Sequence, residues 1–484
     1  MKRVYYIHGT RRNVDRGFHA HKTLRQCIVA LGGTVVFRLE GKGGEFKFTL
    51  NEPDEALLIP PGYWREMTGM DSDTVIMVLA SHEYDEEDYI RNYDDFQHWL
   101  NQPHVVSQAP YLDLTRYNPL LEAPLEAAFR RIMAKGTFIN GASLAAFEEG
   151  FARFCQMRHA VGVANGLDAL TIILQVMGVG AGDEVIVCAA GFAATPMAVS
   201  RVGATPVFVD CEPGGNMDPA SIDAAVTKAS RAILLTHLYG VPARMDEIEA
   251  CGLRHHLPVI ADACQAHGAL WRGRPCETLA FASAFSFYPT KNLGAMGDGG
   301  MIVTNDSRLA EQARIIANYG APAKYRHDYL GLNSRLDEMQ AAFLLVKLPF
   351  LSEWNEKRRR FAALYTEKLS GVPGLVLPSP PKESLPVWHV YAVRVGEGRR
   401  NGLMEHLERR RVGVNIHYPA ALHQLPCYSR PDSFPEAEAL AEETLSLPLD
   451  AMHEEEEILY VCEQVREFFS AAARSCDQPS SGAP

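Results

Sequence analysis

The sequence lacks any long apolar run. No stretch approaches the roughly 20 apolar residues that span a bilayer, and the first ten residues, MKRVYYIHGT, contain no apolar signal core. We therefore expect a cytoplasmic protein that makes no membrane contact and is not exported. The ten cysteines include no CxxC pair and have no regular spacing, which predicts reduced, mostly buried thiols.

An excess of positive charge is also missing. The 484 residues carry a formal net charge of −12, which argues against nucleic-acid binding but leaves room for an anionic small molecule held by a few local donors. The hydrophobic share of 47% and the charged share of 22% are ordinary for a globular protein. The length predicts two or three domains.

Residues 1–100 are predicted to form an all-β domain. Short apolar or alternating runs, among them GTVVFRLE, EFKFTL and TVIMVLA, are separated by Gly, Asn, Pro and Asp at close intervals, which is typical of a small sandwich or barrel. We expect the acidic, aromatic stretch YDEEDYIRNYDDFQHWL to close this domain with a helix. Residues 101–113 contain two prolines and little periodicity and are predicted to be a linker.

Residues 114–474 are predicted to form a second, α/β domain. Short buried strands such as HAVGVA, DEVIVCA and LPVIADA alternate with helical segments, which implies a mostly parallel sheet with helices on both faces. From about residue 350 the pattern becomes helical and mixed, and we expect a smaller C-terminal subdomain there. Residues 475–484 are predicted to be disordered. The sequence contains no internal repeat.

One lysine of the second domain has an unusual setting, between a proline and a run of glycines in SFYPTKNLGAMGDGG. This is Lys291. Gly166 is expected at the start of a helix, where free N–H groups favour a phosphate. Asp262 and Gln265 follow a parallel strand, and open α/β sheets bind ligands at that edge. The set also contains an aromatic residue, a hydroxyl and an amide, namely Phe192, Ser286 and Asn333.

Each of these residues, taken singly, can also be explained without a ligand. A glycine after a strand is usually a turn, an aspartate at a strand end is usually a cap, and a lone lysine is usually solvated. The ordered set is what predicts pyridoxal 5′-phosphate (PLP) as the cofactor. PLP needs a carboxylate at its pyridinium nitrogen and a lysine for the Schiff base.

Residues 111 to about 470 resemble the sugar aminotransferases of the DegT/DnrJ/EryC1/StrS family, which have the aspartate-aminotransferase (type I) PLP fold. The resemblance rests on runs such as GVANGLDALT, DACQAHGA, AFSFYPTKNLGAMGDGG, NSRLDEMQAA and IHYPAALH. It implies a homodimer or a higher homo-oligomer. It also implies roles for individual residues: Lys291 for the Schiff base, Asp262 for the pyridine nitrogen, Gln265 for the ring hydroxyl, Phe192 for stacking, Ser286, Gly166 and the Leu167 backbone for the phosphate, Asn333 for the phosphate in the partner subunit, and Tyr288 and His417 for the substrate.

Two positions depart from that family's pattern. Leu167 stands where threonine or serine is usual, and Gly191 replaces a usual threonine, so we expect weaker rather than absent cofactor binding. Tyr288, in SFYPTK, resembles family members that aminate C3 of nucleotide-linked keto-deoxysugars. Some sugar dehydratases of the superfamily carry histidine in place of the lysine, and Lys291 argues against that activity.

Two histidines in the first domain lie one residue apart, in RGFHAHK. On a strand, His19 and His21 point to the same face. A metal site would need a further glutamate and a later histidine, but Gln26, Trp64 and Arg65 occupy the corresponding regions, so no metal is predicted. A purely structural pair remains an alternative. Proton transfer is the preferred interpretation, since histidine titrates near neutral pH.

Residues 3–100 resemble the sugar 3,4-ketoisomerases, a metal-free cupin (jelly-roll barrel) family that acts on dTDP-4-keto-6-deoxyglucose. RVYYI, RGFHAHK, YWREM and VLASHEYDEEDYIRNYDDF carry the resemblance. It implies that His19 and His21 are the acid/base pair and that Tyr6 and Arg16 lie near the substrate.

The two resemblances together predict a bifunctional enzyme. It would isomerise dTDP-4-keto-6-deoxyglucose to a 3-keto sugar and then aminate C3, with L-glutamate as the amino donor, to give a dTDP-3-amino-3,6-dideoxyhexose. Two alternatives stay open. One is an aminotransferase whose cupin domain only binds the sugar nucleotide, and the other is a PLP-dependent scaffold or regulator without catalytic activity.

Overall fold

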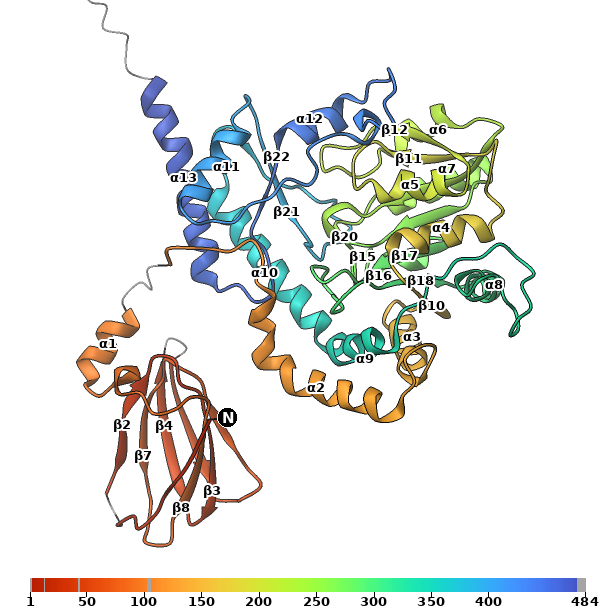
Figure 1. Cartoon of the computed structure of the whole chain (residues 1–484). Coiled ribbons are helices and arrows are strands. Elements are labelled where there is room, and N and C mark those ends of the chain that lie inside the picture. The colour runs from red at the N-terminus through yellow and green to blue at the C-terminus, as the bar shows by residue number, and fades with distance from the viewer. Residues whose placement is uncertain (1, 13, 42–43, 102–105, 477–484) are drawn as a thin grey trace, which may run out of the picture. The chain divides into compact units, whose positions relative to one another are not determined.

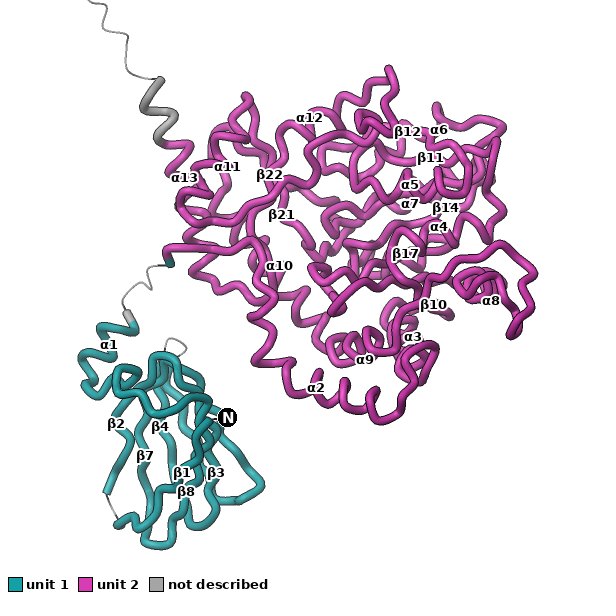
Figure 2. Tube along the Cα trace, viewed as in Figure 1, with its two compact units in different colours: residues 1–106 teal, residues 107–484 magenta. Residues whose placement is uncertain are grey.

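A computed structural model describes residues 2–12, 14–41, 44–101 and 106–476. The chain divides into two compact units, residues 1–106 (unit 1) and residues 107–484 (unit 2), which Figure 2 shows in different colours. Within the described ranges, no helix is both long and apolar enough to cross a bilayer.

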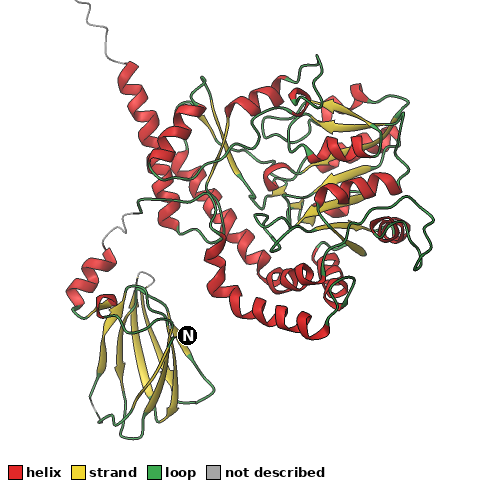
Figure 3. Cartoon of the chain, in the orientation of Figure 1, coloured by secondary structure: helices red, strands yellow, loops and turns green. Residues whose placement is uncertain are grey.

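Unit 1 is a β-sandwich built from two antiparallel sheets, as Figure 3 shows. One sheet has the strand order β1-β8-β3-β6, and the other has the order β5-β4-β7-β2-β9. The strands are β1 (Arg3–Ile7), β2 (Arg16–His21), β3 (Gln26–Gly32), β4 (Val35–Gly41), β5 (Gly44–Leu50), β6 (Leu57–Ile59), β7 (Trp64–Thr68), β8 (Val75–Ala80) and β9 (Tyr89–Ile90). The predicted all-β fold of this domain is confirmed.

The interior of unit 1 is apolar over most of its length. Alternation along the strands sends every second side chain inward, and residues such as Phe37, Ile59, Met67 and Val78 pack there between the two sheets. The opposite face of β2 and β7 carries Ala20 and Trp64, which pack with Phe96 of helix α1 (Tyr93–Asn101). The helix expected at the end of the acidic stretch is therefore present, preceded by the short helix η1 (Glu86–Asp88).

Unit 2 is organised around a seven-stranded sheet with the order β10-β18-β17-β14-β13-β11-β12. Its strands are β10 (His159–Val163), β11 (Glu184–Cys188), β12 (Thr205–Val209), β13 (Ser230–Thr236), β14 (Val259–Asp262), β17 (Ala282–Ser286) and β18 (Gly300–Thr304). Strand β18 runs antiparallel to both neighbours, and the other neighbouring pairs are parallel. The carboxyl ends of all strands except β18 therefore meet at one edge.

Helices cover this sheet, as predicted (Figure 1). They are α2 (Asn118–Lys135), α3 (Ala142–Phe154), α4 (Gly166–Val176), α5 (Ala194–Arg201), α6 (Pro219–Ala225), α7 (Met245–His255), α8 (Ser307–Ala317) and α9 (Glu338–Lys347). Short 3-10 helices accompany them: η2 (Leu114–Tyr117) precedes α2, η3 (Leu238–Gly240) and η4 (Cys276–Leu279) lie between members of the set, and η5 (Leu348–Phe350) follows α9. The sheet strands read as nearly continuous apolar runs because both faces are buried.

The expected C-terminal subdomain is built on a small antiparallel sheet with the order β19-β21-β22. Its elements are α10 (Leu351–Leu369), β19 (Leu375–Val376), β21 (Tyr391–Val395), α11 (Arg400–Arg409), η6 (Leu422–Gln424), α12 (Pro435–Glu443), β22 (Thr444–Leu447) and α13 (Glu455–Cys476). A second small sheet joins β15 (Leu270–Trp271), β16 (Arg274–Pro275) and β20 (Ser384–Leu385).

The structure bears on the two segments expected to be irregular. Of the predicted linker, residues 102–105 lie outside the described residues, and Ala109 pairs with Val412 of unit 2 in a parallel bridge. The later part of the segment thus belongs to unit 2. Of the predicted disordered tail, residues 475–476 end α13, and residues 477–484 lie outside the described residues.

Candidate active sites

The predicted cofactor residues of unit 2 gather at the carboxyl edge of its sheet. Asp262 is the last residue of β14 and Ser286 is the last residue of β17. Phe192 follows β11, and Gly166 follows β10. Lys291 lies in the loop after β17. Residues spread over more than 120 positions of the sequence are thus brought together because parallel strands end at the same edge.

Lys291 is a largely buried lysine without a counter-ion. Its Nζ has no hydrogen-bond or ion-pair partner within the described residues, and its backbone N–H donates to the Tyr288 carbonyl at 2.8 Å. Burial lowers the pKa of Lys291, against the opposing effect of Cys264 and Asp262. A lysine with a lowered pKa offers a neutral amine at a higher fraction near neutral pH, which a nucleophile or a proton carrier requires.

Asp262 is held in one orientation by two donors. It is 4% exposed. Its Oδ2 accepts from the Thr195 hydroxyl at 3.0 Å, and its Oδ1 accepts from the backbone N–H of Cys264 at 3.1 Å. These bonds fix the orientation of the carboxylate at the strand end. Thr195 was not singled out in the sequence, because its contact with Asp262 spans 67 positions.

The N-terminus of α4 forms a turn suited to an anion. Asn165 caps the helix by accepting from Asp168 N–H at 2.8 Å. The N–H groups of Gly166 and Leu167 donate no hydrogen bond within the described part of the chain. A Cβ on Gly166 would lie 2.6 Å from the Sγ of Cys264 and 3.1 Å from the Cβ of Ser286. Glycine is therefore required for the helix to begin this close to the strand ends.

Phe192 and Gln265, the two residues predicted to contact the cofactor ring, differ in how their side chains are held. Phe192 is 54% exposed, and its ring centroid lies 5.4 Å from that of Tyr418. Gln265 is 4% exposed and fixed at both ends of its amide: Oε1 accepts from Tyr239 N–H at 2.6 Å, and Nε2 donates to the Tyr418 hydroxyl at 3.0 Å. Tyr418 thus contacts both predicted residues, although no local pattern in the sequence marks it.

The remaining predicted residues of unit 2 fall into an inner and an outer group. His417 lies toward the lysine: burial, with Lys291 adding to it, lowers the pKa of His417 to about 4, and its Nδ1 is 2.8 Å from Ser446 Oγ. Tyr288 is 53% exposed and Asn333 is also exposed. The Leu167 side chain packs against the apolar core, so only its backbone faces the anion turn.

These residues fit the cofactor that the sequence predicts. The site combines an unpartnered lysine amine, a buried carboxylate held by two donors and a helix N-terminus with two free amides. Each of these corresponds to one functional group of PLP, respectively its carbonyl carbon, pyridine nitrogen and phosphate.

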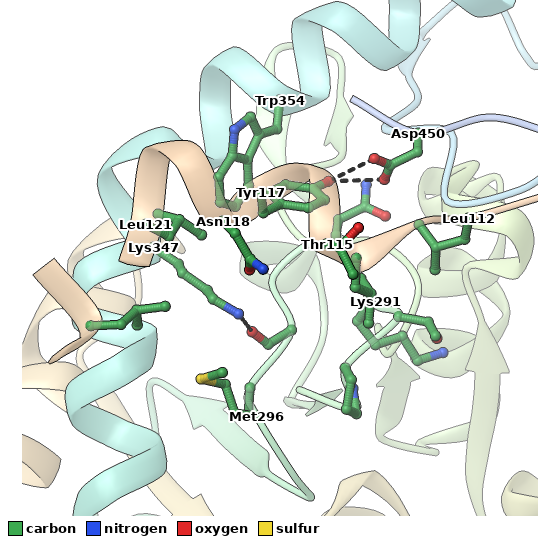
Figure 4. Close-up of a pocket in the computed structure, with 17 residues that line it drawn as sticks. Leu112, Thr115, Tyr117, Asn118, Leu121, Lys291, Met296, Lys347, Trp354 and Asp450 are labelled. Carbon is green, nitrogen blue, oxygen red and sulfur yellow. Dashed lines mark hydrogen bonds between the residues drawn. The ribbon is translucent and has the colours of Figure 1, made fainter. Parts of the chain in front are cut away.

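A cavity of about 250 Å³ adjoins the loop that carries Lys291 (Figure 4). Its wall includes Tyr117, whose hydroxyl donates to Asp450 at 2.9 Å, and Lys347, whose Nζ donates to the Gly294 carbonyl at 2.7 Å. Figure 4 shows the Lys291 amine pointing away from Lys347 and Met296. Lys291 is itself one of the residues that line this cavity.

The histidine pair of unit 1 faces the interior of its sandwich, as expected. His21 is fully buried, and its ring centroid lies 5.0 Å from that of His19. A bulge between Gly17 and His19 interrupts the pairing of β2 with β7. Gly17 has a φ of +101°, and a Cβ there would lie 2.8 Å from the Arg65 carbonyl oxygen. Bulges commonly re-aim side chains next to active sites.

Hydrogen bonds fix the tautomer of both rings. His21 Nδ1 lies 2.9 Å from Asp88 Oδ2, and His19 Nδ1 lies against the Gly17 carbonyl. Because both neighbours only accept, each Nδ1 carries the proton and each neutral ring presents a lone pair at Nε2. Burial lowers the pKa of His19 to about 4 and also lowers that of His21, with Arg65 adding to both shifts.

Asp88 is anchored more firmly than a surface carboxylate. Its Oδ1 accepts from the backbone N–H of Thr23 at 2.6 Å and from the Thr23 hydroxyl at 2.7 Å, and its Oδ2 accepts from Leu24 N–H at 3.3 Å. Burial raises the pKa of Asp88, but these bonds and His21 outweigh it, so the net shift is downward. Asp88 lies in the acidic run of the sequence, yet only the fold pairs it with His21.

The substrate residues predicted for unit 1 lie outside the histidine cluster. Strand alternation turns Tyr6 outward, where it is 55% exposed, and Arg16 is also exposed. Tyr5 points inward instead, and its hydroxyl accepts from Gln26 Nε2 at 2.9 Å. Among the described residues, no group of three or more His, Cys, Asp or Glu side chains is placed to hold a metal ion.

The fold and the sites define the class of the protein. Unit 2 is a type I PLP-dependent transferase, and unit 1 is a cupin-like sandwich. Residues 120–466 match the DegT/DnrJ/EryC1/StrS aminotransferase family, and the chain belongs to that family. Residues 1–101 match the FdtA family, described as WxcM-like, C-terminal. Both resemblances drawn from the sequence are thereby confirmed, and so is PLP as the cofactor.

The relatives and solved structures agree with this assignment. The chain is 44% identical over 366 residues to the dTDP-3-amino-3,4,6-trideoxy-alpha-D-glucose transaminase of Streptomyces venezuelae, covering 75% of this chain and 96% of that protein. It is 40% identical over 362 residues to the dTDP-3-amino-3,6-dideoxy-alpha-D-galactopyranose transaminase of Aneurinibacillus thermoaerophilus, covering 74% and 99%. The crystal structure of DesV from S. venezuelae matches with a TM-score of 0.73 at 43% identity, covering 75% of this chain and 98% of that one.

Proposed function

We propose that the chain is bifunctional. Unit 1 would isomerise a dTDP-linked 4-keto-6-deoxyhexose to its 3-keto isomer, and unit 2 would aminate C3 with L-glutamate as donor. The observation that carries the second activity is the unpartnered amine of the half-buried Lys291 near the fixed carboxylate of Asp262. The two relatives described above are, by name, transaminases of dTDP-3-amino sugars, which supports C3 as the site of amination.

The residues of unit 2 would divide the work of amino transfer. PLP, when bound, supplies an electron sink and carries the amino group from donor to acceptor. Lys291 would bind the cofactor and move the proton on the substrate carbon, since its lowered pKa favours the neutral amine. Asp262, held by Thr195, would keep the ring nitrogen protonated. The free amides of Gly166 and Leu167, with Ser286, would hold the phosphate.

The residues of unit 1 suit a proton transfer between neighbouring carbons. His21 is neutral near pH 7 and presents Nε2 to the interior, so it can take the proton from C3 of the sugar. Asp88 acts as a positioning residue, because it holds the ring by Nδ1 and stabilises the imidazolium that forms. His19 can exchange protons at the adjacent positions. The observation that carries this activity is the pair of neutral rings in fixed tautomers, of which His21 has its Nε2 atom buried without a partner among the described residues.

The two activities fit in sequence. The isomerase would make the 3-keto sugar that a C3 aminotransferase consumes. We also propose that the chain forms a homodimer in which Asn333 reaches the phosphate of the partner subunit, because Asn333 is exposed on its own chain.

The competing proposal is an aminotransferase whose cupin domain only binds the sugar nucleotide. Lys291→Ala and the double variant His19→Ala/His21→Ala separate the two. Given the 4-keto sugar nucleotide and glutamate, the lysine variant should accumulate the 3-keto isomer and no amine. The histidine variant should make little amine from that substrate but aminate an independently supplied 3-keto sugar at the wild-type rate.

Mixing the two variants should restore amine formation, because each contributes one working site. Proton NMR of the products reads all of these outcomes. If the histidine variant aminates the 4-keto sugar directly at C4, unit 1 is not on the pathway and the binding-domain proposal replaces this one.

A further inference from the structure

A buried arginine without a counter-ion stands in the interior of unit 1. Arg65 is 1% exposed, and its Nη1 donates to the side-chain oxygen of Gln26. Its Nε and Nη2 atoms have no hydrogen-bond partner among the described residues. Although burial lowers the pKa of Arg65 to about 10, the guanidinium stays charged near pH 7. Fully buried arginines are normally paired, so the two free N–H groups call for an acceptor.

The strand register places this arginine opposite the histidine pair. Arg65 of β7 is the direct partner of His19 on β2, and directly paired residues point to the same face of a sheet. Met67, two residues after Arg65, packs in the apolar interior of the sandwich. Arg65, His19 and His21 therefore share one interior surface. The Nε2 atom of His21 is also buried without a partner.

The free part of the guanidinium is one complete edge. Nε and Nη2 lie side by side, and their N–H groups point in parallel, which is the geometry that grips two adjacent oxygen atoms at once. Gln26 occupies only Nη1, and its own Nε2 donates to the Tyr5 hydroxyl. The Tyr5–Gln26 pair thus orients the arginine without neutralising its charge.

A structural role alone does not explain this arrangement. An apolar side chain such as that of Met67 fills the equivalent inward position on the same strand. Exchanging a buried ionic group for apolar packing is often neutral or stabilising. A charge kept here with an unused donor edge, beside an unprotonated histidine nitrogen, is the pairing of base and electrophile that proton abstraction next to a carbonyl needs.

We propose that Arg65 is a catalytic residue of unit 1, whose free Nε–Nη2 edge binds the two neighbouring sugar oxygens, O3 and O4, and stabilises the negative charge that develops on them. The proposal rests on the isomerase function inferred above. A planar pair of oxygens on adjacent carbons matches the spacing of the two parallel donors.

The electrons and protons of this step balance without a redox partner. His21 Nε2 takes the proton from C3, the electrons of the C3–H bond form a double bond between C3 and C4, and the C4 carbonyl electrons move onto O4. The O3 hydroxyl then loses its proton, O4 gains one, and C4 receives a proton from a histidine as the C3 carbonyl forms. Arg65 is bound to both oxygens while the charge passes between them.

The test uses the full-length holoenzyme with the 4-keto sugar nucleotide in deuterated water and no amino donor. The 3-keto product and the deuterium that it gains at C4 are followed by proton NMR. Arg65→Met should lower kcat about 100- to 1000-fold, with KM changed less than about threefold and a thermal midpoint no lower than that of the wild type. Arg65→Lys should recover only part of the loss, since one ammonium replaces two parallel donors.

Two controls tie the effect to this position. Arg38→Met removes a half-exposed arginine of the neighbouring strand β4, which pairs with Glu45 and Glu66, and should leave isomerisation unchanged. Millimolar guanidinium should restore activity to Arg65→Ala, and equal ionic strength from sodium chloride should not. Amination of a supplied 3-keto sugar should stay at the wild-type rate in every variant.

Several results would overturn the proposal. A rise in KM with kcat intact in Arg65→Met would mean that the arginine holds the nucleotide diphosphate instead. Loss of activity in all three Arg65 variants with lowered thermal midpoints and no guanidinium rescue would make Arg65 structural. If the wild type itself forms no 3-keto product, the isomerase function fails and the role of Arg65 fails with it.

Discussion

Replacing Asp88 by asparagine tests the positioning of His21 directly. The carboxylate accepts from three donors besides His21, namely the backbone N–H and hydroxyl of Thr23 and the N–H of Leu24. An asparagine can present its oxygen to Thr23, but its NH₂ group then faces His21 Nδ1 and Leu24. The ring must accept at Nδ1, so the proton moves to Nε2 and the base is lost.

The size of the effect follows from this clash. Losing general base catalysis should lower the isomerase kcat about 100- to 10,000-fold. A charge-assisted bond is lost and a buried donor faces another donor, which should cost about 1–3 kcal/mol of unfolding free energy. For a unit of about 100 residues, each kcal/mol lowers the thermal midpoint by about 4–8 °C.

The assay measures the 3-keto product and its deuterium uptake at C4 by proton NMR, with the full-length protein in deuterated water. Asp88→Glu keeps the charge and should retain more activity than Asp88→Asn. Asp54→Asn, which alters an exposed carboxylate of the same unit, should match the wild type, and amination of a supplied 3-keto sugar should be unaffected. A folded Asp88→Asn variant that isomerises within about threefold of the wild type would refute the reasoning.

Further predictions concern both sites. Thr195→Val removes one of the two donors to Asp262 and should slow amination about tenfold or more, since a hydrogen bond to a charged group contributes about 1.5–3 kcal/mol; an unchanged rate would show that the Cys264 N–H is sufficient. Borohydride treatment of the holoenzyme should attach the cofactor to Lys291, and peptide mass mapping that finds it on another lysine would contradict the assignment. The isomerase should stay active after chelation, whereas loss with rescue by a divalent ion would favour a metal. Because the pKa of His19 is lowered from 6.5 to about 4, the unfolded chain binds more protons between these values, so the unfolding free energy of unit 1 should rise with pH from about 4 to 6.5; a flat profile by chemical denaturation would contradict the burial of a neutral ring.

The sequence alone determined the class of each unit. The strands of unit 2 are short apolar runs separated by helices, and such alternation permits little besides a parallel sheet. Lys291, Asp262 and Gly166 stand in contiguous motifs, so their neighbours in sequence already indicate the chemistry. In unit 1 the spacing of His19 and His21 was enough to place both on one face of a strand.

Tertiary structure decided the contacts that orient these groups. Thr195 meets Asp262, Tyr418 meets Gln265 and Asp88 meets His21 across 67, 153 and 67 positions, respectively. No local pattern marks such pairs, because each depends on which strands or loops become neighbours. The same holds for Tyr5 and Tyr6, which are adjacent on β1. Packing against the other sheet decides which face of β1 turns inward, and therefore that Tyr5 and not Tyr6 lies in the interior.

Arg65 shows most clearly what could not be predicted from the sequence. In the sequence it is one arginine in the run YWREM, and arginines are usually solvated. Its burial follows from the pairing of β7 with β2 and β4, which turns this position into the sandwich together with Met67. The sequence shows that an arginine is present at this position. That its Nε–Nη2 edge is buried and unpaired near His21 follows only from the packing of the two sheets, because removal from water depends on the tertiary structure.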